Sequence, residues 1–182
     1  MAIKRAKRRE PLTEAALFEY AVRALAAKMR TERELRRLMK TRAAEGRDGE
    51  RAIDAVVARL KQLNYLSDTR FAADYTRLRK ENQKLGRRRV QQDLAGKGVA
   101  PATAAAALTS AYEGVDEVAL ARQYIDRKRM KQPGGAGVPR EIREKEASRV
   151  MGRLLRAGFS AGTVFKVLRS WGVEVEEFEV EE

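Results

Sequence analysis

A dense group of cationic side chains lies in the middle of this 182-residue sequence. Arginine offers paired donors to a phosphate or a carboxylate, and lysine acts as a compact point charge, so the mixture suits a nucleic-acid backbone or an acidic protein surface. Within the same stretch only Glu81 and Asp93 oppose it. The central basic group consists of Arg77, Arg79, Lys80, Lys84, Arg87, Arg88, Arg89 and Lys97. Its density predicts a polyanionic partner and says little about sequence-specific reading.

Two smaller basic groups accompany the central one along the chain. They comprise Arg36, Arg37 and Lys40, with Arg42 nearby, and Arg127, Lys128, Arg129 and Lys131. Any one of these residues alone is more typical of a solvated helix face than of a binding site. The prediction therefore concerns the set, which could form a basic stripe across the molecule.

The overall composition agrees with binding rather than catalysis. Lysine and arginine number 39 against 26 acidic residues, a net charge of +13, and the chain has no histidine and no cysteine. The commonest general base, thiol nucleophiles, disulfides and thiolate metal sites are thereby excluded. No apolar run approaches the roughly 20 residues needed to span a bilayer. We therefore expect a cytoplasmic protein that is not an enzyme, needs no cofactor or metal and does not enter the membrane.

Apolar residues recur at helical spacing in nearly every segment, and no segment is typical of a strand, so an all-α fold is predicted. The first helix should begin at Thr13, and the second at Thr31, where Glu34 completes the spacing of a capping box. Gly46 and Gly49 should close the second helix. The expected inward stripes of the first three helices are Leu17, Ala21, Ala24, Leu25 and Met29, then Leu35, Leu38 and Met39, then Ile53, Val56, Val57, Leu60 and Leu63.

The same pattern recurs twice more. A helix should start at Ser67 or Asp68, another at Pro101 and another at Asp116 or Glu117. Their inward faces, with that of a short helix between the first two, should be Phe71, Ala72, Tyr75 and Leu78, then Val90 and Leu94, then Leu108 and Tyr112, then Leu120, Ala121, Tyr124 and Ile125. Segments 146–155 and 164–171 should complete the third set.

Direct self-similarity supports a repeat. Leu94, Gly98, Thr103 and Leu108 match Leu154, Gly158, Thr163 and Leu168 at one constant offset. We predict three tandem three-helix repeats in an elongated, curved array of undetermined hand. The predicted parts are a basic arm (1–12), three modules (13–64, 65–114 and 115–172), a Gly/Pro linker (132–139) inside the third module, and an acidic tail (173–182).

Several other patterns have a plainer explanation than a site. Tyr20, Tyr75 and Tyr124 could stack on bases, but apolar helix faces favour core packing for Tyr75 and Tyr124. The acidic residues at 141, 144 and 146 alternate with basic ones, which is typical of helical charge pairing rather than a metal site. The tail carries six glutamates. It is either a solubilising end or a segment that pairs with the basic groups and competes with DNA.

Four short segments resemble, in order and spacing, the signatures of the RecX family of regulatory proteins. They are Tyr65–Ala72, Leu85–Val90 and Leu94–Val99 for its central module, and Arg156–Ser160 for its final module. The resemblance covers about residues 13 to 172. It implies three three-helix modules, no catalysis, and binding along the groove of the RecA nucleoprotein filament. The Gly/Pro linker and the acidic tail depart from the family pattern.

The expected function is regulation of the RecA recombinase. We expect a monomer that binds RecA filaments, and single- and double-stranded DNA non-specifically, through its basic residues. It should modulate, mainly by inhibition, filament assembly, ATPase and strand exchange in recombination, DNA repair and the SOS response. One alternative is a stand-alone helical DNA-binding protein, against which the repeated modules argue. A carboxylate and Mg²⁺ nuclease is the other, but no acidic constellation supports it.

Overall fold

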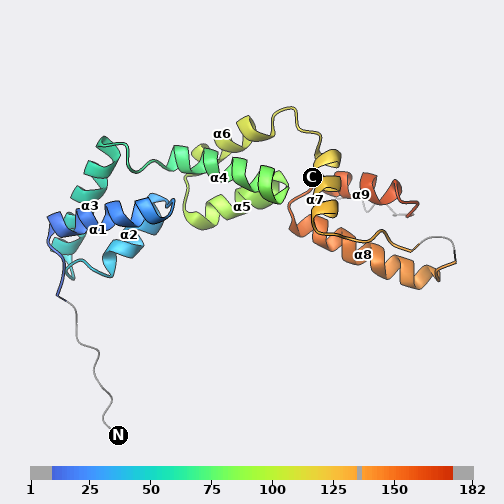
Figure 1. The fold of residues 1–182 in the computed structure, drawn as a ribbon, viewed down its shortest axis with the longest axis horizontal. Helices are drawn as coiled ribbons and strands as arrows, with labels where there is room; N and C mark the ends of the chain where they lie inside the picture. Colours follow the sequence, from blue (N-terminus) through green and yellow to red (C-terminus); the bar gives the residue numbers. More distant parts are fainter. Residues whose placement is uncertain (1–9, 135–136, 174–182) are drawn as a thin grey trace, which may run out of the picture. The chain divides into compact units, whose positions relative to one another are not determined.

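The computed structural model describes residues 10–134 and 137–173, and every regular element in these ranges is an α-helix (Figure 1). The all-α prediction is confirmed. The helices are α1 (Glu14–Ala27), α2 (Glu32–Lys40), α3 (Arg47–Gln62), α4 (Asp68–Gln83), α5 (Arg87–Lys97), α6 (Pro101–Tyr112), α7 (Glu117–Arg127), α8 (Arg140–Arg156) and α9 (Ala161–Arg169). The acidic tail beyond Val173 lies outside the described residues, as does most of the basic arm.

The chain divides into two compact units. Unit 1 consists of Met1–Ala72 and Gly96–Thr103, and unit 2 of Ala73–Ala95 and Ala104–Glu182. The boundary passes through α4, α5 and α6, so each of these helices contributes residues to both units. The division into three modules at residues 64 and 114 stays a prediction.

The core of unit 1 lies among α1, α2 and α3. Leu17, Leu35, Met39, Val56 and Leu60 are almost fully buried there. Local capping fixes where the first two helices begin. The Thr13 hydroxyl accepts a hydrogen bond from the Ala16 amide, and Thr31 and Glu34 form the predicted capping box. Both predicted starts are confirmed.

The start of α3 corrects the expectation that Gly46 and Gly49 close the second helix. Gly46 is the N-cap of α3, and Gly49 lies inside its first turn. A Cβ on Gly49 would overlap the carbonyl oxygen of Ala44, so the loop after α2 runs directly against this turn. Glycine at 49 therefore permits a close approach within a helix rather than ending one.

Three residues assigned to inward stripes are exposed instead. Met29 is 43% exposed because α1 ends at Ala27 and the chain is extended at Lys28. Leu63, at 48%, is the C-cap of α3, where the helix leaves its core. Leu78 is 39% exposed because the buried face of α4 continues through Thr76, which has no exposed surface.

The core of unit 2 is built mainly by α7, α8 and α9. Leu120, Leu154 and Val164 are buried there, and the Tyr124 and Phe159 rings meet edge to face at 5.8 Å. Core packing of Tyr124 is thus confirmed. The expected starts at Asp116 and Pro101 are also confirmed, as the N-cap of α7 and the first residue of α6.

The last two helices begin earlier than expected. Helix α8 starts at Arg140 rather than at 146, directly after Pro139, and α9 starts at Ala161 with Ser160 as its N-cap. None of the helices in the described ranges is long and apolar enough to cross a membrane.

Candidate functional site

The first turn of α5 carries three consecutive exposed arginines, Arg87, Arg88 and Arg89, which we call the arginine cluster. Three arginine side chains on one turn concentrate positive charge at the positive end of the helix dipole. The side chains supply the donors, because the Arg88 amide already donates to the Gly158 carbonyl. A helix N-terminus favours anions for the same electrostatic reason. The turn is therefore suited to hold phosphate or carboxylate groups.

A backbone contact within unit 2 fixes the position of this turn. The Gly86 amide donates to the Ala157 carbonyl oxygen at 2.9 Å, and the Arg88 amide donates to that of Gly158 at 3.3 Å. A Cβ on Gly86 would overlap the Gly158 carbonyl, and a Cβ on Gly158 would overlap the Arg89 amide. Gly158 also has a φ of +92°, which favours glycine. The two glycines thus allow the arginine cluster to stand against the turn between α8 and α9.

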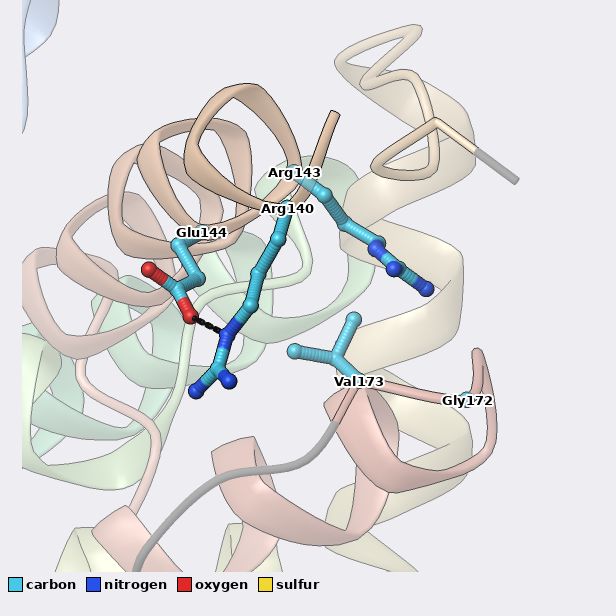
Figure 2. A pocket seen from close by; sticks show the side chains of 5 residues that line it. All are labelled: Arg140, Arg143, Glu144, Gly172 and Val173. Carbon is cyan, nitrogen blue, oxygen red and sulfur yellow. Dashed lines mark hydrogen bonds and ion pairs between the residues drawn. The ribbon is translucent and has the colours of Figure 1, made fainter. Parts of the chain in front are cut away.

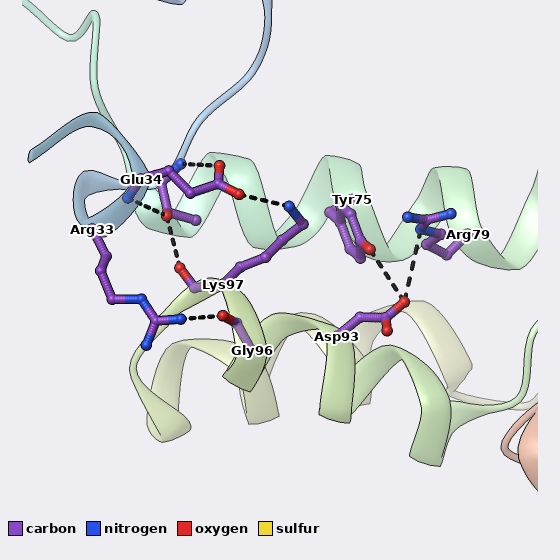
Figure 3. A network of polar contacts seen from close by, with 8 residues as sticks. Arg33, Glu34, Tyr75, Arg79, Asp93, Gly96 and Lys97 are labelled. Atoms are coloured by element: carbon purple, nitrogen blue, oxygen red, sulfur yellow. Dashed lines mark hydrogen bonds and ion pairs between the residues drawn. The ribbon is translucent and has the colours of Figure 1, made fainter. Parts of the chain in front are cut away.

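Asp93 orients one member of the cluster and one arginine of α4. The Arg89 Nε atom donates to Asp93 Oδ1 at 3.0 Å, and the Arg79 Nε atom lies 3.9 Å from Oδ2. The Tyr75 hydroxyl donates to Oδ2 at 3.1 Å, and the Arg79 guanidinium lies 4.7 Å from the Tyr75 ring centre (Figure 3). Burial raises the pKa of Tyr75, so its hydroxyl stays protonated and can donate. One half-buried carboxylate thereby sets the direction of two guanidinium groups.

The other two arginines of the cluster differ in their surroundings. Arg87 donates to the Thr109 hydroxyl at 3.2 Å, a neutral partner that leaves its charge uncompensated. Within residues 10–134 and 137–173 no ion pair involves the Arg88 side chain, although its charge helps to lower the pKa of Glu117. The cluster therefore keeps most of its positive charge available to a ligand.

Glu117 supports the same turn from the opposite side. It accepts hydrogen bonds from the Ser160 amide at 3.1 Å, from the Ser160 hydroxyl at 2.6 Å and from the Thr163 hydroxyl. Burial raises the pKa of Glu117, but these hydrogen bonds and Arg88 outweigh burial and leave the pKa lowered. The ionised carboxylate ties the start of α7 to the start of α9, next to Gly158.

Other members of the central basic group are engaged within the fold. Arg77 lies between Asp74 and Glu81, at 3.3 and 3.5 Å, and Lys80 donates to the Ala111 carbonyl at 2.7 Å near the end of α6. Lys84 is half-buried just after α4. Their part in binding a ligand stays a prediction.

Lys97 lies at a separate junction in unit 1, where it joins the end of α5 to the start of α2. Its ammonium donates to Glu34 Oε1 at 2.8 Å (Figure 3). The ammonium also lies 5.7 Å from the Phe71 ring centre. Its carbonyl accepts from the Thr31 hydroxyl at 2.8 Å, and the Gly96 carbonyl accepts from Arg33. Lys97 belongs to unit 1 and the arginine cluster to unit 2.

The remaining predicted residues form two sets, and all of them except Arg36 are exposed. Arg37 and Lys40 are exposed on α2, whereas Arg36 is half-buried between Glu32 and Asp54, at 2.7 and 2.6 Å. The third set lies at and just after the end of α7 and is exposed: Arg127, Lys128, Arg129 and Lys131. Cations at a helix C-terminus also stabilise the helix dipole, so these residues have a structural role available as well.

A hollow in unit 2 provides a weaker candidate. It is lined by Arg140, Arg143, Glu144, Gly172 and Val173 (Figure 2). Arg140 donates to Glu144 at 2.5 Å, which compensates one of the two guanidinium charges. In the part of the chain that the structure describes, no group of three or more acidic residues could hold a metal ion. The arginine cluster is the stronger candidate for an anion site, because more of its positive charge is uncompensated.

The sequence shows the arginines but not the tertiary contacts that hold them in place. Leu85–Val90 and Arg156–Ser160 are separate segments in the sequence, and the structure brings them into backbone contact. Their glycines were the available signal, since a glycine can mark a close approach of two backbones as well as the end of a helix, and Gly158 does both. The role of Glu117 had no sequence signal, because a lone glutamate at a helix start is typical of dipole pairing.

Comparisons with known proteins give one consistent result. A family model described as "RecX, second three-helix domain" matches residues 67–108. Regulatory protein RecX of Thermobifida fusca is 32% identical over 128 residues, which cover 68% of this chain and 65% of that protein. Regulatory protein RecX of Streptomyces coelicolor is 28% identical over 161 residues, which cover 88% and 79%. The chain thus matches just under two thirds of the length of the Thermobifida protein.

Solved structures agree at the level of fold. The crystal structure of RecX from Lactobacillus salivarius has a TM-score of 0.63 at 18% identity and covers 87% of this chain and 96% of its own. A second crystal structure of regulatory protein RecX has a TM-score of 0.66 at 21% identity and covers 86% and 73%.

Proposed function

The chain belongs to the RecX family, and from this premise we propose that it binds RecA nucleoprotein filaments and modulates, mainly by inhibition, their assembly, ATPase and strand exchange. The proposal includes non-specific binding of single- and double-stranded DNA by a monomer. It also includes the division of the chain into three modules, with boundaries at residues 64 and 114. Catalysis has no part in it.

The observation that carries the proposal is the placement of the arginine cluster. The segments that resemble the family signatures contain the arginine cluster rather than a cleft with catalytic groups. Gly86 and Gly158 in these segments allow the close backbone contact, and Arg87–Arg89 follow Gly86 directly. Because the backbone of this turn is already fixed, phosphate binding has only the arginine side chains left to order. A filament that carries DNA presents repeated phosphates and acidic protein surface to such a turn.

The exposed cations outside the cluster would extend this contact. Arg37 and Lys40 belong to unit 1, and the set from Arg127 to Lys131 belongs to unit 2. Binding to several phosphates releases several counterions, so the affinity should fall steeply with salt. Contacts to phosphate and to acidic side chains account for affinity without base-specific reading.

The direct test uses RecA from the organism that encodes this chain. RecA filaments are formed on single-stranded DNA, and ATP hydrolysis and filament length are measured as the protein is added. We expect both to decrease at protein concentrations well below that of RecA. No effect on either quantity would contradict the proposal. Tight, sequence-selective binding to naked duplex DNA without any effect on RecA would instead support a stand-alone DNA-binding protein.

A further inference from the structure

A groove on unit 1 is separate from the arginine cluster and has a different chemistry. Its walls come from the chain before α1, from α1 itself, from Arg30 and from the end of α2. Five apolar or aromatic residues and three arginines line it: Leu12, Ala16, Tyr20, Ala24 and Leu38, with Arg23, Arg30 and Arg42. Among the residues that the structure describes, no carboxylate lines this groove. Apolar surface rimmed by one sign of charge is typical of a site for a ligand that is both apolar and oppositely charged.

Arg42 gives the strongest indication that the groove suits an anionic group. Its guanidinium carbon lies 5.6 Å from the Tyr20 ring centre, and its own carbonyl accepts a hydrogen bond from the Leu12 amide at 2.8 Å. Its Nε atom is buried and has no hydrogen-bond partner among the described residues. No carboxylate among the described residues pairs with this guanidinium, so its positive charge is available to an anionic group in the groove.

The other two arginines are held at the groove by backbone contacts. The Arg23 Nε atom donates to the Glu19 carbonyl at 3.3 Å, and the Arg30 Nε atom donates to that of Ala24 at 3.2 Å. The Glu19 carboxylate lies 3.9 Å from Arg23 with both side chains about three quarters exposed, so this pair compensates little charge. Three guanidinium groups therefore line a groove whose apolar residues lie on α1, on α2 and, at Leu12, just before α1.

We propose that this groove binds an extended acidic peptide segment of a partner protein, with carboxylates on the arginines and an apolar side chain against Ala16 and Leu38. Guanidinium groups match carboxylates as paired donors. The Arg42 guanidinium lies over one face of the Tyr20 ring, so that face is not available for stacking on a nucleobase. The apolar residues contribute to binding a peptide side chain, whereas a bare phosphate backbone would leave them unused.

This inference deepens the proposed function and rests on it for the source of the peptide. Peptide binding itself is measured without RecA, so the two can fail separately. Loss of the groove interaction with an intact effect on RecA would overturn only this inference.

The test uses a fluorescent synthetic peptide of alternating glutamate and leucine residues, and a counterpart with glutamine in place of glutamate. Both are titrated with the full chain and with a chain that ends at Val173, and binding is followed by anisotropy. We expect the glutamate peptide to bind both proteins with equal affinity and the glutamine peptide to bind at least about tenfold more weakly. Binding to the shortened chain alone would show that the chain's own acidic tail occupies the groove, and would overturn the assignment to a partner.

Point variants locate the interaction. Arg42→Gln should weaken the glutamate peptide about tenfold, because one charge-assisted contact is lost. Arg59→Gln is the matched control: its guanidinium stacks on Phe18 at 4.3 Å in the same unit but lies outside the groove, and it should leave the affinity unchanged. Ala16→Glu, in the first turn of α1, keeps the helix and adds a repelling carboxylate, so it should also weaken binding. Equal losses for Arg42→Gln and Arg59→Gln would mean non-specific charge attraction and would refute the groove.

Discussion

Gly86 and Gly158 approach so closely that neither tolerates a side chain without movement of backbone atoms. The contact lies directly before the arginine cluster, and the Arg88 amide takes part in it. Asp93 then orients Arg89 through a bond of 3.0 Å. The backbone position of the cluster is thus set by the two glycines, and the direction of the Arg89 side chain is set by one carboxylate.

Replacing Gly86 by alanine should destabilise the protein by about 1–3 kcal/mol, because a methyl group must push the turn at 157–158 away. Gly96→Ala, inside the helix α5 that follows Gly86, is the matched control. Nothing lies within 4 Å of its added Cβ, so it should raise the free energy of unfolding by about 0.5–1 kcal/mol. Urea unfolding followed by circular dichroism measures both. Similar effects of the two variants would rule out a tight contact at Gly86.

A contact between two helix ends helps to hold unit 1 together. Thr31 is fully buried at the start of α2, where its hydroxyl accepts from the Glu34 amide at 3.2 Å and donates to the Lys97 carbonyl at 2.8 Å. The side chains of Glu34 and Lys97 meet across the same junction. One capping box therefore serves both the start of α2 and the end of α5.

Thr31→Val keeps the shape of the side chain but removes both hydrogen bonds. We expect it to lower the free energy of unfolding by about 2 kcal/mol, since a cap is lost and a carbonyl loses its partner. Thr13→Val removes a cap that has only a local partner, Ala16, and should cost about 1 kcal/mol. Thermal or urea unfolding compares them, and a smaller loss for Thr31→Val than for Thr13→Val would contradict the double role.

Most helix starts could be predicted because their signals are local. Thr13, Thr31, Pro101 and Asp116 each act within one turn of the residue itself, so the sequence contains the whole cause. Gly49 was misassigned because its partner, Ala44, lies in a loop whose path no periodicity describes.

The candidate site was predictable in part for the same reason. The arginines are visible in the sequence, whereas the Gly86 contact joins segments about 70 residues apart, and only packing brings these together. Which arginines keep their charge available likewise depends on tertiary neighbours. Arg36 and Lys97 look like surface cations in the sequence but are half-buried and paired with carboxylates.

At the scale of the whole molecule, charge determines which partner the protein meets. A net charge of +13 attracts any polyanion, and specificity must come from where fixed cations stand. The arginine cluster is the most rigidly supported of the exposed basic sets described here. If it is the contact to the filament, removing it should matter more than removing the same charge elsewhere.

Binding to RecA filaments on single-stranded DNA, measured across a range of salt concentrations, tests this claim most directly. The proteins compared are the wild type, a variant with Arg87, Arg88 and Arg89 all replaced by alanine, and a control with the exposed Arg122, Arg149 and Arg153 replaced by alanine. We predict that the cluster variant binds more weakly and that its slope of log affinity against log salt is shallower by about 2, from three lost phosphate contacts. The control should keep a slope near that of the wild type. A cluster variant with the affinity and slope of the wild type, or one that matches the control, would contradict the account.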